Sequence, residues 1–265
     1  MNLPELPMSC LIRNALVALI VVLNPALAAC PRSASGAGTT TIVELYTSEG
    51  CDSCPPADKW FSSLSYQRDG VVPLAFHVDY WDYIGWKDRF AQAAFAERQR
   101  TTVARQGSRT VYTPQVMFDG RDARAISLGT VLREGVRAAS QQPARATLQL
   151  ASQLAGDTLA ISVLAAVPDG ALRRESSLFI VVTEDNLQSS VTAGENRGVA
   201  LRHDHVARTL IGPIPLHADG NLEITRKISL PREWKHADLQ VAAFVKRGGN
   251  GEILQALAAP TCPMS

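Results

Sequence analysis

The spacing of hydrophobic positions changes near residue 143, and this change predicts a chain with two differently built parts. In the first part, short apolar runs alternate with segments of good helix formers. The runs expected to form strands are residues 41–47, 71–80 and 115–118. The segments expected to form helices are residues 55–65, 88–106 and 127–140. Strands that alternate with helices are typical of an α/β domain, which we expect over residues 41–142.

From residue 143 onward, hydrophobic and polar residues alternate in short runs. The expected strands are residues 146–152, 158–167, 177–185, 222–230, 239–246 and 253–259. Glycine, proline, asparagine and aspartate lie between several of these runs, and these residues favour tight turns. Short strands at regular spacing predict an antiparallel β-sandwich-like domain over residues 143–265.

The first 29 residues have the pattern of an export signal. Residues 15–23 are an uninterrupted apolar run, and small residues follow at 26–29. The run is too short to cross a hydrocarbon core of about 30 Å as a helix. A short apolar core that ends in small residues is typical of a signal peptide that is removed, although a buried N-terminal helix is an alternative. We therefore expect export to the bacterial periplasm or cell envelope, with residues 30–40 as a polar tether.

Composition narrows the class of protein further. Hydrophobic residues make up 46% of the 265 residues, and the formal net charge is +1. A highly charged disordered chain would be less apolar, and a polytopic membrane protein more so. Because nucleic-acid binding needs a basic surplus, no nucleic-acid partner is expected. The oligomeric state is left open.

The chain has five cysteines, and we expect different chemical states for them. Cys10 leaves with the signal peptide. Cys30 follows Leu27-Ala28-Ala29, which is similar to a bacterial lipoprotein cleavage site, so a lipid on Cys30 would attach the chain to a membrane. Alternatively, Cys30 pairs with Cys262, since the ends of a compact chain often lie close together. Both readings place the protein in an oxidising compartment, where disulfides persist.

The motif Cys51-Asp52-Ser53-Cys54 carries the clearest chemical signal. It lies between an expected strand and an expected helix, where a thioredoxin-like dithiol would be found. Unpaired backbone N–H groups at a helix start stabilise a thiolate. We therefore expect Cys51 to attack a disulfide and Cys54 to resolve the mixed disulfide, with a protein or a small thiol as redox partner.

Other interpretations of this motif are weaker or remain open. A zinc site would need two more cysteine or histidine ligands nearby, and a haem-attachment motif would need histidine where Pro55 stands. No metal or other cofactor is therefore predicted. The open alternative is a structural disulfide in a non-catalytic envelope lipoprotein or binding module, so enzymatic activity is itself an open question.

Two further positions fit a redox site. Glu44 interrupts an apolar strand seven residues before Cys51, where a half-buried carboxylate could accept the proton of Cys54. Alternatively, Glu44 lies on a strand face that is exposed to solvent. Thr113-Pro114 precedes the strand at 115–118, where thioredoxin-like folds place a cis-proline whose preceding residue pairs with bound peptide.

An aromatic and acidic cluster follows the second strand. The members that we expect to line a substrate groove are His77, Asp79, Tyr80, Trp81 and Trp86. The alternative is a loop packed by its own aromatic residues, with His77 hydrogen-bonded in the core. Farther along, residues 195–197, His203, His205 and Arg208 are expected to form a polar network that holds a long loop or faces the first domain.

Four segments resemble a known family. They are VELYTSEGCDSCPPAD (43–58), FHVDYWDYIGWKDRF (76–90), ERQ (97–99) and VYTPQVMFDG (111–120), with weaker similarity at 194–198 and 201–208. The chain thereby resembles the exported bacterial proteins known as domain of unknown function 1223, which are assigned to the thioredoxin-like superfamily. The resemblance implies a thioredoxin-like domain followed by a β-rich one, with the family's CxxC on Cys51 and Cys54 and its proline on Pro114. It implies no particular reaction.

Overall fold

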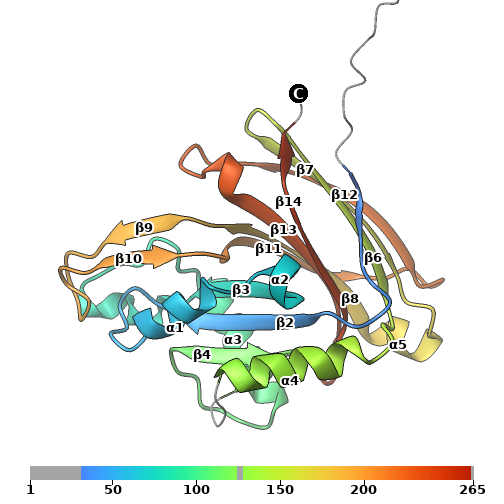
Figure 1. Cartoon of the computed structure of the whole chain (residues 1–265), viewed down its shortest axis with the longest axis horizontal. Helices are drawn as coiled ribbons and strands as arrows, with labels where there is room; N and C mark the ends of the chain where they lie inside the picture. Colours follow the sequence, from blue (N-terminus) through green and yellow to red (C-terminus); the bar gives the residue numbers. More distant parts are fainter. Residues whose placement is uncertain (1–30, 124–127, 264–265) are drawn as a thin grey trace, which may run out of the picture. The chain divides into compact units, whose positions relative to one another are not determined.

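An eight-stranded sheet connects the early and late parts of the chain in the computed structural model, which describes residues 31–123 and 128–263 (Figure 1). Its strands, in spatial order, are β14 (Ile253–Pro260), β13 (Leu239–Arg247), β8 (Ser176–Glu184), β11 (Val206–Pro215), β3 (Val71–His77), β2 (Thr41–Thr47), β4 (Gln115–Phe118) and β5 (Arg121–Asp122). β2 pairs with β3 in parallel and with β4 antiparallel. All seven residues of β2 and of β3 are buried, which explains their continuous apolar sequence.

Helices cover both faces of this sheet around β2 and β3. α1 (Pro55–Phe61) and α4 (Leu128–Ser140) pack on the face that Val43 and Leu45 present. α3 (Ala93–Arg105) packs on the opposite face against Tyr46 and Phe76. The short α2 (Tyr66–Asp69) precedes β3, and the 3₁₀ helix η1 (Asp79–Ile84) follows it. Alternate residues of β2 therefore belong to two different cores.

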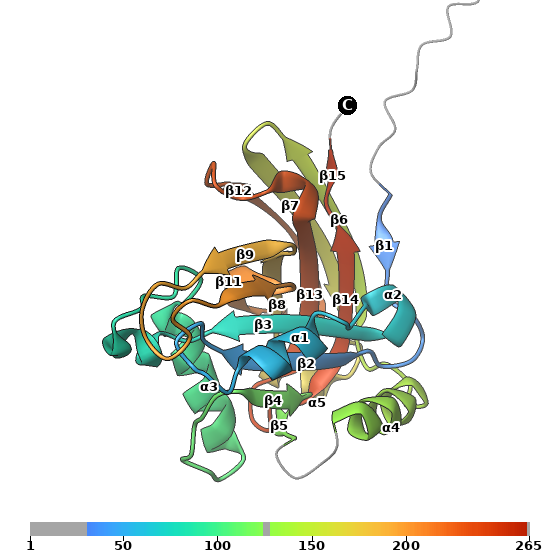
Figure 2. The same ribbon diagram turned by 60° about the vertical axis from the view of Figure 1, so that its left-hand side comes forward.

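A second sheet packs against β8, β13 and β14, on the face opposite to α3. It consists of β1 (Ser33–Ala34), β6 (Thr147–Ala155), β7 (Thr158–Ala166), β12 (Asn221–Ser229) and β15 (Cys262–Pro263). Alternating burial along β6 and β7 leaves one face for the shared core and one for solvent. The remaining elements are α5 (Gly170–Glu175), the hairpin of β9 (Leu187–Ser190) and β10 (Ala200–His203), and the 3₁₀ helix η2 (His236–Asp238). Figure 2 shows β6 of the second sheet beside β14 of the larger one.

The overall class is mostly β-sheet with some helices, and the sheets are antiparallel and mixed. The strands expected at 41–47 and 115–118 have exactly these bounds as β2 and β4. The helix expected at 88–106 begins later, at Ala93, because residues 88–92 form turns around the buried Asp88.

Two expectations about chain organisation differ from the structure. The longer helices do lie before residue 143, but the strands on both sides of it share one sheet, and the described residues form one compact unit. Residues 33–40, expected to be part of a polar tether, are instead hydrogen-bonded to the rest of the protein. β1 pairs with β6, and the Gln255 side-chain amide donates hydrogen bonds to the carbonyl groups of Gly36 and Gly38. The expected signal peptide, residues 1–29, lies outside the described residues, and no described helix is long and apolar enough to cross a membrane.

Candidate functional site

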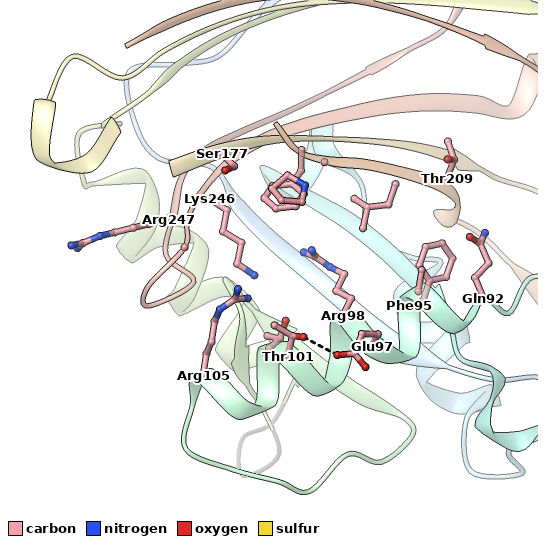
Figure 3. Close-up of a pocket in the computed structure, with 17 residues that line it drawn as sticks. Gln92, Phe95, Glu97, Arg98, Thr101, Arg105, Ser177, Thr209, Lys246 and Arg247 are labelled. Carbon is pink, nitrogen blue, oxygen red and sulfur yellow. Dashed lines mark hydrogen bonds between the residues drawn. The ribbon is translucent and has the colours of Figure 1, made fainter. Parts of the chain in front are cut away.

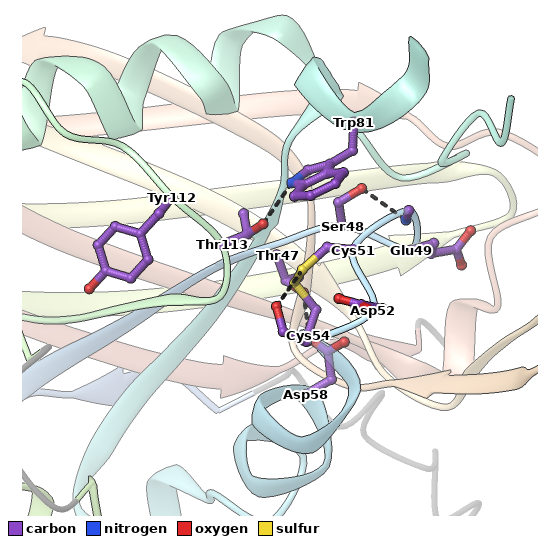
Figure 4. The surroundings of a disulfide bond; sticks show 12 residues. Thr47, Ser48, Glu49, Cys51, Asp52, Cys54, Asp58, Trp81, Tyr112 and Thr113 are labelled. Carbon is purple, nitrogen blue, oxygen red and sulfur yellow. Dashed lines mark hydrogen bonds between the residues drawn. A yellow bond between two sulfur atoms is a disulfide. The ribbon is translucent and has the colours of Figure 1, made fainter. Parts of the chain in front are cut away.

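A disulfide bond joins Cys51 and Cys54 at the junction between β2 and α1 (Figure 4). Cys54 caps the N-terminus of α1, and the prolines that follow it fit the first helical turn, where no N–H donor is needed. The motif therefore has the strand-to-helix placement that the sequence predicts.

Both sulfur-bearing residues are shielded from solvent. Cys51 and Cys54 have 0% exposure, whereas Asp52 and Ser53 between them are exposed. The loop of residues 191–199 between β9 and β10, which we call the covering loop, contacts the motif. The Asn196 side-chain amide donates hydrogen bonds to the carbonyl oxygens of Glu49 and Cys51, each at 2.9 Å. The Asp52 N–H donates to Glu195 Oε2 at 3.2 Å.

Another side of the disulfide is formed by Trp81 and Thr113, which Figure 4 shows next to it. Trp81 Nε1 donates a hydrogen bond of 2.7 Å to Thr113 Oγ1. The peptide bond between Thr113 and Pro114 is cis, as the sequence analysis predicts. This contact ties the chain before β4 to the start of η1, beside the CxxC motif.

A buried carboxylate, Asp58, lies on α1 one helical turn after Cys54. Thr47 Oγ1 donates a hydrogen bond of 2.8 Å to Asp58 Oδ1, and Figure 4 shows both side chains beside the disulfide. The other oxygen, Oδ2, is buried and accepts no hydrogen bond from any described residue. Burial raises the pKa of Asp58, although the nearby imidazoles of His203 and His77 oppose this shift.

Two histidines from distant parts of the chain extend the buried polar cluster. His77 Nδ1 lies 2.6 Å from Asp88 Oδ2, and His203 Nε2 lies 3.3 Å from Glu49 Oε1. The two imidazole rings meet edge to face at 4.8 Å. Burial alone would lower the pKa of His77, but the Asp88 carboxylate outweighs it and raises this pKa. The same pairing lowers the pKa of Asp88 against the effect of burial.

The structure separates Glu44 from the role expected for it. Because successive β2 side chains point to opposite faces, Glu44 points toward α3, away from α1 and Asp58. There it forms an ion pair with Arg98. The geometry thus gives Glu44 a structural partner, and the carboxylate on the α1 side is Asp58.

Of the other expected groove residues, one is buried and three are partly exposed. His77 is fully buried. Tyr80 Oη donates to Gln99 Oε1 at 3.1 Å, and Trp86 Nε1 donates to Glu49 Oε2 at 2.8 Å. Asp79 begins η1 and is partly exposed.

Cys262 lies in β15, and Cys30 lies outside the described residues. Among residues 31–123 and 128–263, no group of three or more histidine, cysteine, aspartate or glutamate side chains is arranged to hold a metal ion.

Three features of the site are not predicted from the sequence. They are the buried carboxylates of Glu49 and Asp58, and the hydrogen bonds that the Asn196 amide donates to the backbone of the motif. Asp58 has a detectable signal, because position four after Cys54 faces the same side of a helix. Asn196 belongs to the polar network expected to hold a long loop or face the first domain, and the structure confirms that contact. The sequence around Asn196 gives no indication that its partner is the backbone of Glu49 and Cys51, which lie about 145 residues earlier.

The structure thus defines a mostly β fold that carries a CxxC disulfide. The family model described as "Protein of unknown function (DUF1223)" matches residues 42–246, and the chain belongs to this family. No curated protein matches the chain.

Two solved structures share the fold. HBP35 of Porphyromonas gingivalis has a TM-score of 0.65 at 15% identity, with 86% of this chain and 76% of that chain covered. Protein AGR_C_4864 from Agrobacterium tumefaciens has a TM-score of 0.54 at 25% identity, with 84% and 95% covered. Neither name states a reaction.

Proposed function

We propose that this protein is an exported thiol–disulfide redox protein of the cell envelope, with a thioredoxin-like site in which Cys51 is the nucleophile and Cys54 the resolving cysteine. The observation that carries the proposal is the placement of the disulfide, between β2 and α1 and beside the cis Thr113–Pro114 bond. Cysteine pairs at the start of a helix are suited to thiolate chemistry, because the first turn offers unpaired N–H donors.

The reaction proceeds through a mixed disulfide. In the reduced protein, the Cys51 thiolate attacks one sulfur of a substrate disulfide, and the other substrate sulfur leaves as a thiolate. Cys54 then loses its proton and attacks Cys51 Sγ, which releases the second substrate thiolate and forms the Cys51–Cys54 disulfide. Two electrons pass to the substrate, and the reverse sequence oxidises a dithiol.

Asp58 supplies the proton acceptor for Cys54 in this scheme. Its Oδ2 has no hydrogen-bond donor among the described residues, and burial raises its pKa toward the range in which a carboxylate can exchange protons with a thiol. Thr113 lies where its backbone could pair with an extended substrate, and Trp81 supplies an apolar wall.

The partner of this reaction is a protein or small-molecule disulfide or thiol of the envelope. Attachment through a lipid on Cys30 and closure of the chain by a Cys30–Cys262 bridge are the two competing proposals for the N-terminal cysteine. Intact-mass measurement of the mature protein separates them, because lipidation adds a diacylglycerol group.

The second candidate function is a non-catalytic binding module stabilised by the same disulfide. The complete burial of Cys51 and Cys54 favours it, because a substrate sulfur cannot reach Cys51 in this arrangement. In the redox proposal the covering loop must move, so the two functions make different predictions about reactivity.

The deciding experiment measures the reduction potential of the pair and traps its partners. We expect a potential above about −300 mV, because structural disulfides lie below that value. The Cys54→Ser variant should accumulate a mixed disulfide that mass spectrometry maps to Cys51, and the matched Cys51→Ser variant should not. A potential below about −300 mV together with no trapped partner would establish the structural alternative.

A further inference from the structure

A cavity of about 560 Å³ lies between α3 and the eight-stranded sheet, on the α3 face of that sheet (Figure 3). Its volume is within the range of about 300–1,000 Å³ that small-molecule sites occupy. Part of the wall is apolar and comes from Phe95, Phe179, Leu210 and Pro213. Exposed residues such as Ala94 form the rim on α3, so the cavity opens to solvent.

Basic side chains gather at one end of this cavity. Figure 3 shows Lys246, Arg98 and Arg105 pointing into the space between α3 and the sheet, while Arg247 points away. Gly251 lies beside two of them, since a Cβ on it would be in ordinary contact with Lys246 Cε at 3.4 Å and with Arg105 Cδ at 3.7 Å.

The charges of this end are incompletely balanced by the protein. Arg98 is paired with Glu44, and Arg247 with Glu175. Lys246 is only 5% exposed, yet no described residue forms a hydrogen bond or ion pair with its ammonium group.

Arg105 likewise has no ion pair within the described parts of the chain. The remaining acidic neighbour, Glu97, lies on the exposed side of α3 and interacts with Arg100 and Thr101. A buried cation without a counter-ion costs free energy unless a ligand supplies the charge.

We propose that this cavity binds a small amphiphilic carboxylate, whose head group lies between Lys246 and Arg105 and whose apolar body packs on Phe95 and Phe179. A carboxylate accepts charge-assisted hydrogen bonds from both cations, and its negative charge matches the ammonium group of Lys246, which has no partner among the described residues. The proposal is independent of the disulfide, which lies between β2 and α1 and does not line this cavity.

The protonation of Lys246 gives the site a characteristic pH dependence. The pKa of Lys246 is lowered to about 8, chiefly by burial; Glu44 opposes this shift, and Arg98 and Arg105 contribute to it. A bound carboxylate favours the charged ammonium group. Affinity should therefore be highest below pH 8 and fall as the pH rises through that value, while the ligand stays ionised throughout.

The test is calorimetric titration of the purified protein with decanoate at pH 7, with decanol as the uncharged control of equal length. We expect saturable binding of decanoate with a dissociation constant below about 1 mM, and much weaker binding of decanol. Lys246→Met should weaken decanoate binding about tenfold or more, since it removes a charge-assisted hydrogen bond. The matched control is Lys227→Met, which removes an exposed lysine on β12.

A second variant guards against misfolding. Arg105 is exposed near the end of α3, so Arg105→Gln should leave the fold intact while it weakens decanoate binding. Binding of decanol as tight as that of decanoate, or equal decanoate affinity in Lys246→Met, Arg105→Gln and wild type, would overturn the proposal. So would the absence of saturable decanoate binding.

Discussion

Asp58 is the residue on which the redox proposal is most sharply tested, because its environment is suited to accepting a proton. It is held at one oxygen by Thr47 and leaves the other without a donor among the described residues. Its Oδ2 lies 3.9 Å from His203 Nδ1, beyond hydrogen-bond distance, and burial of a carboxylate oxygen without a hydrogen bond is costly, which favours a functional role.

We expect the Asp58→Asn variant to slow the step in which Cys54 attacks Cys51. Reduced protein mixed with 5,5′-dithiobis(2-nitrobenzoate) should release thionitrobenzoate in two phases, the first from attack by Cys51 and the second from resolution by Cys54. Loss of the proton acceptor should slow the second phase by about 10- to 100-fold and leave the first nearly unchanged. In the wild type, the second phase should slow as the pH falls through the raised pKa of Asp58, because a protonated carboxyl accepts no proton.

The control for this prediction is Asp157→Asn, which removes an exposed carboxylate in the turn between β6 and β7. It should leave both phases at the wild-type rate. Equal second phases in Asp58→Asn and wild type, with the same pH profile, would remove Asp58 from the reaction.

At the same residue scale, Glu44 shows why the sequence could not assign the proton acceptor. β2 is buried on both faces, so its apolar residues carry no period-two signal that would tell which face meets α1. Glu44 and Asp58 are both isolated acidic residues near the motif in sequence. The pleat of β2 turns Glu44 toward the α3 face of the sheet, whereas Asp58 lies on the α1 face. The cis Thr113–Pro114 bond, by contrast, could be predicted, because thioredoxin-like folds place a cis-proline ahead of the corresponding strand.

Among the elements, the covering loop determines whether the disulfide can react. Residues 191–199 hold the motif through Asn196 and Glu195, and Gly194 packs closely enough that a Cβ there would lie 3.1 Å from Ile84 Cδ1. The loop joins two strands of only four residues each, in a separate two-stranded sheet. Elements with few buried contacts open at lower free energy than the core, so this loop is the element best suited to expose Cys51.

We expect Asn196→Ala to make the Cys51–Cys54 bond easier to reduce. The substitution removes two buried hydrogen bonds between the loop and the motif, which together are worth about 1–3 kcal/mol. If opening of the loop limits access, reduction by dithiothreitol should become about tenfold faster, as measured by alkylation and mass spectrometry.

The neighbouring Arg197→Ala variant serves as the control, because Arg197 is exposed. It should be reduced at the wild-type rate. An unchanged rate in Asn196→Ala would show that the reductant reaches the sulfurs by another path.

The elements also show how far sequence patterns extend. Long runs with clear alternation, such as β6 and β7, are evident from the sequence alone. The strand β11 is not evident, because a glycine and two prolines interrupt its apolar residues and its burial falls off after Ala207. Its partners β3 and β8 are far away in sequence, so neither pairing leaves a local trace.

For the whole molecule, β11 has the largest consequence, since it joins the two halves of the larger sheet. It pairs with β3 in parallel and with β8 antiparallel. The core on the α3 face is correspondingly mixed: Tyr46 and Phe76 from the first part pack with Val181 and Phe244 from the second. A segment of residues 41–142 alone would expose both the edge of β3 and this apolar surface to water.

We therefore expect the mature protein to unfold in one cooperative transition. Urea unfolding followed by tryptophan fluorescence should coincide with unfolding followed by far-UV circular dichroism, because Trp60, Trp81 and Trp86 lie in the first part and much of the strand content lies in the second. A fragment of residues 41–142 should show no cooperative transition and should bind an apolar dye, since its α3-face core lacks Phe244 and the strand that covers β3. Two separate transitions in the full chain, or a cooperative transition in the fragment, would instead identify two domains that fold independently.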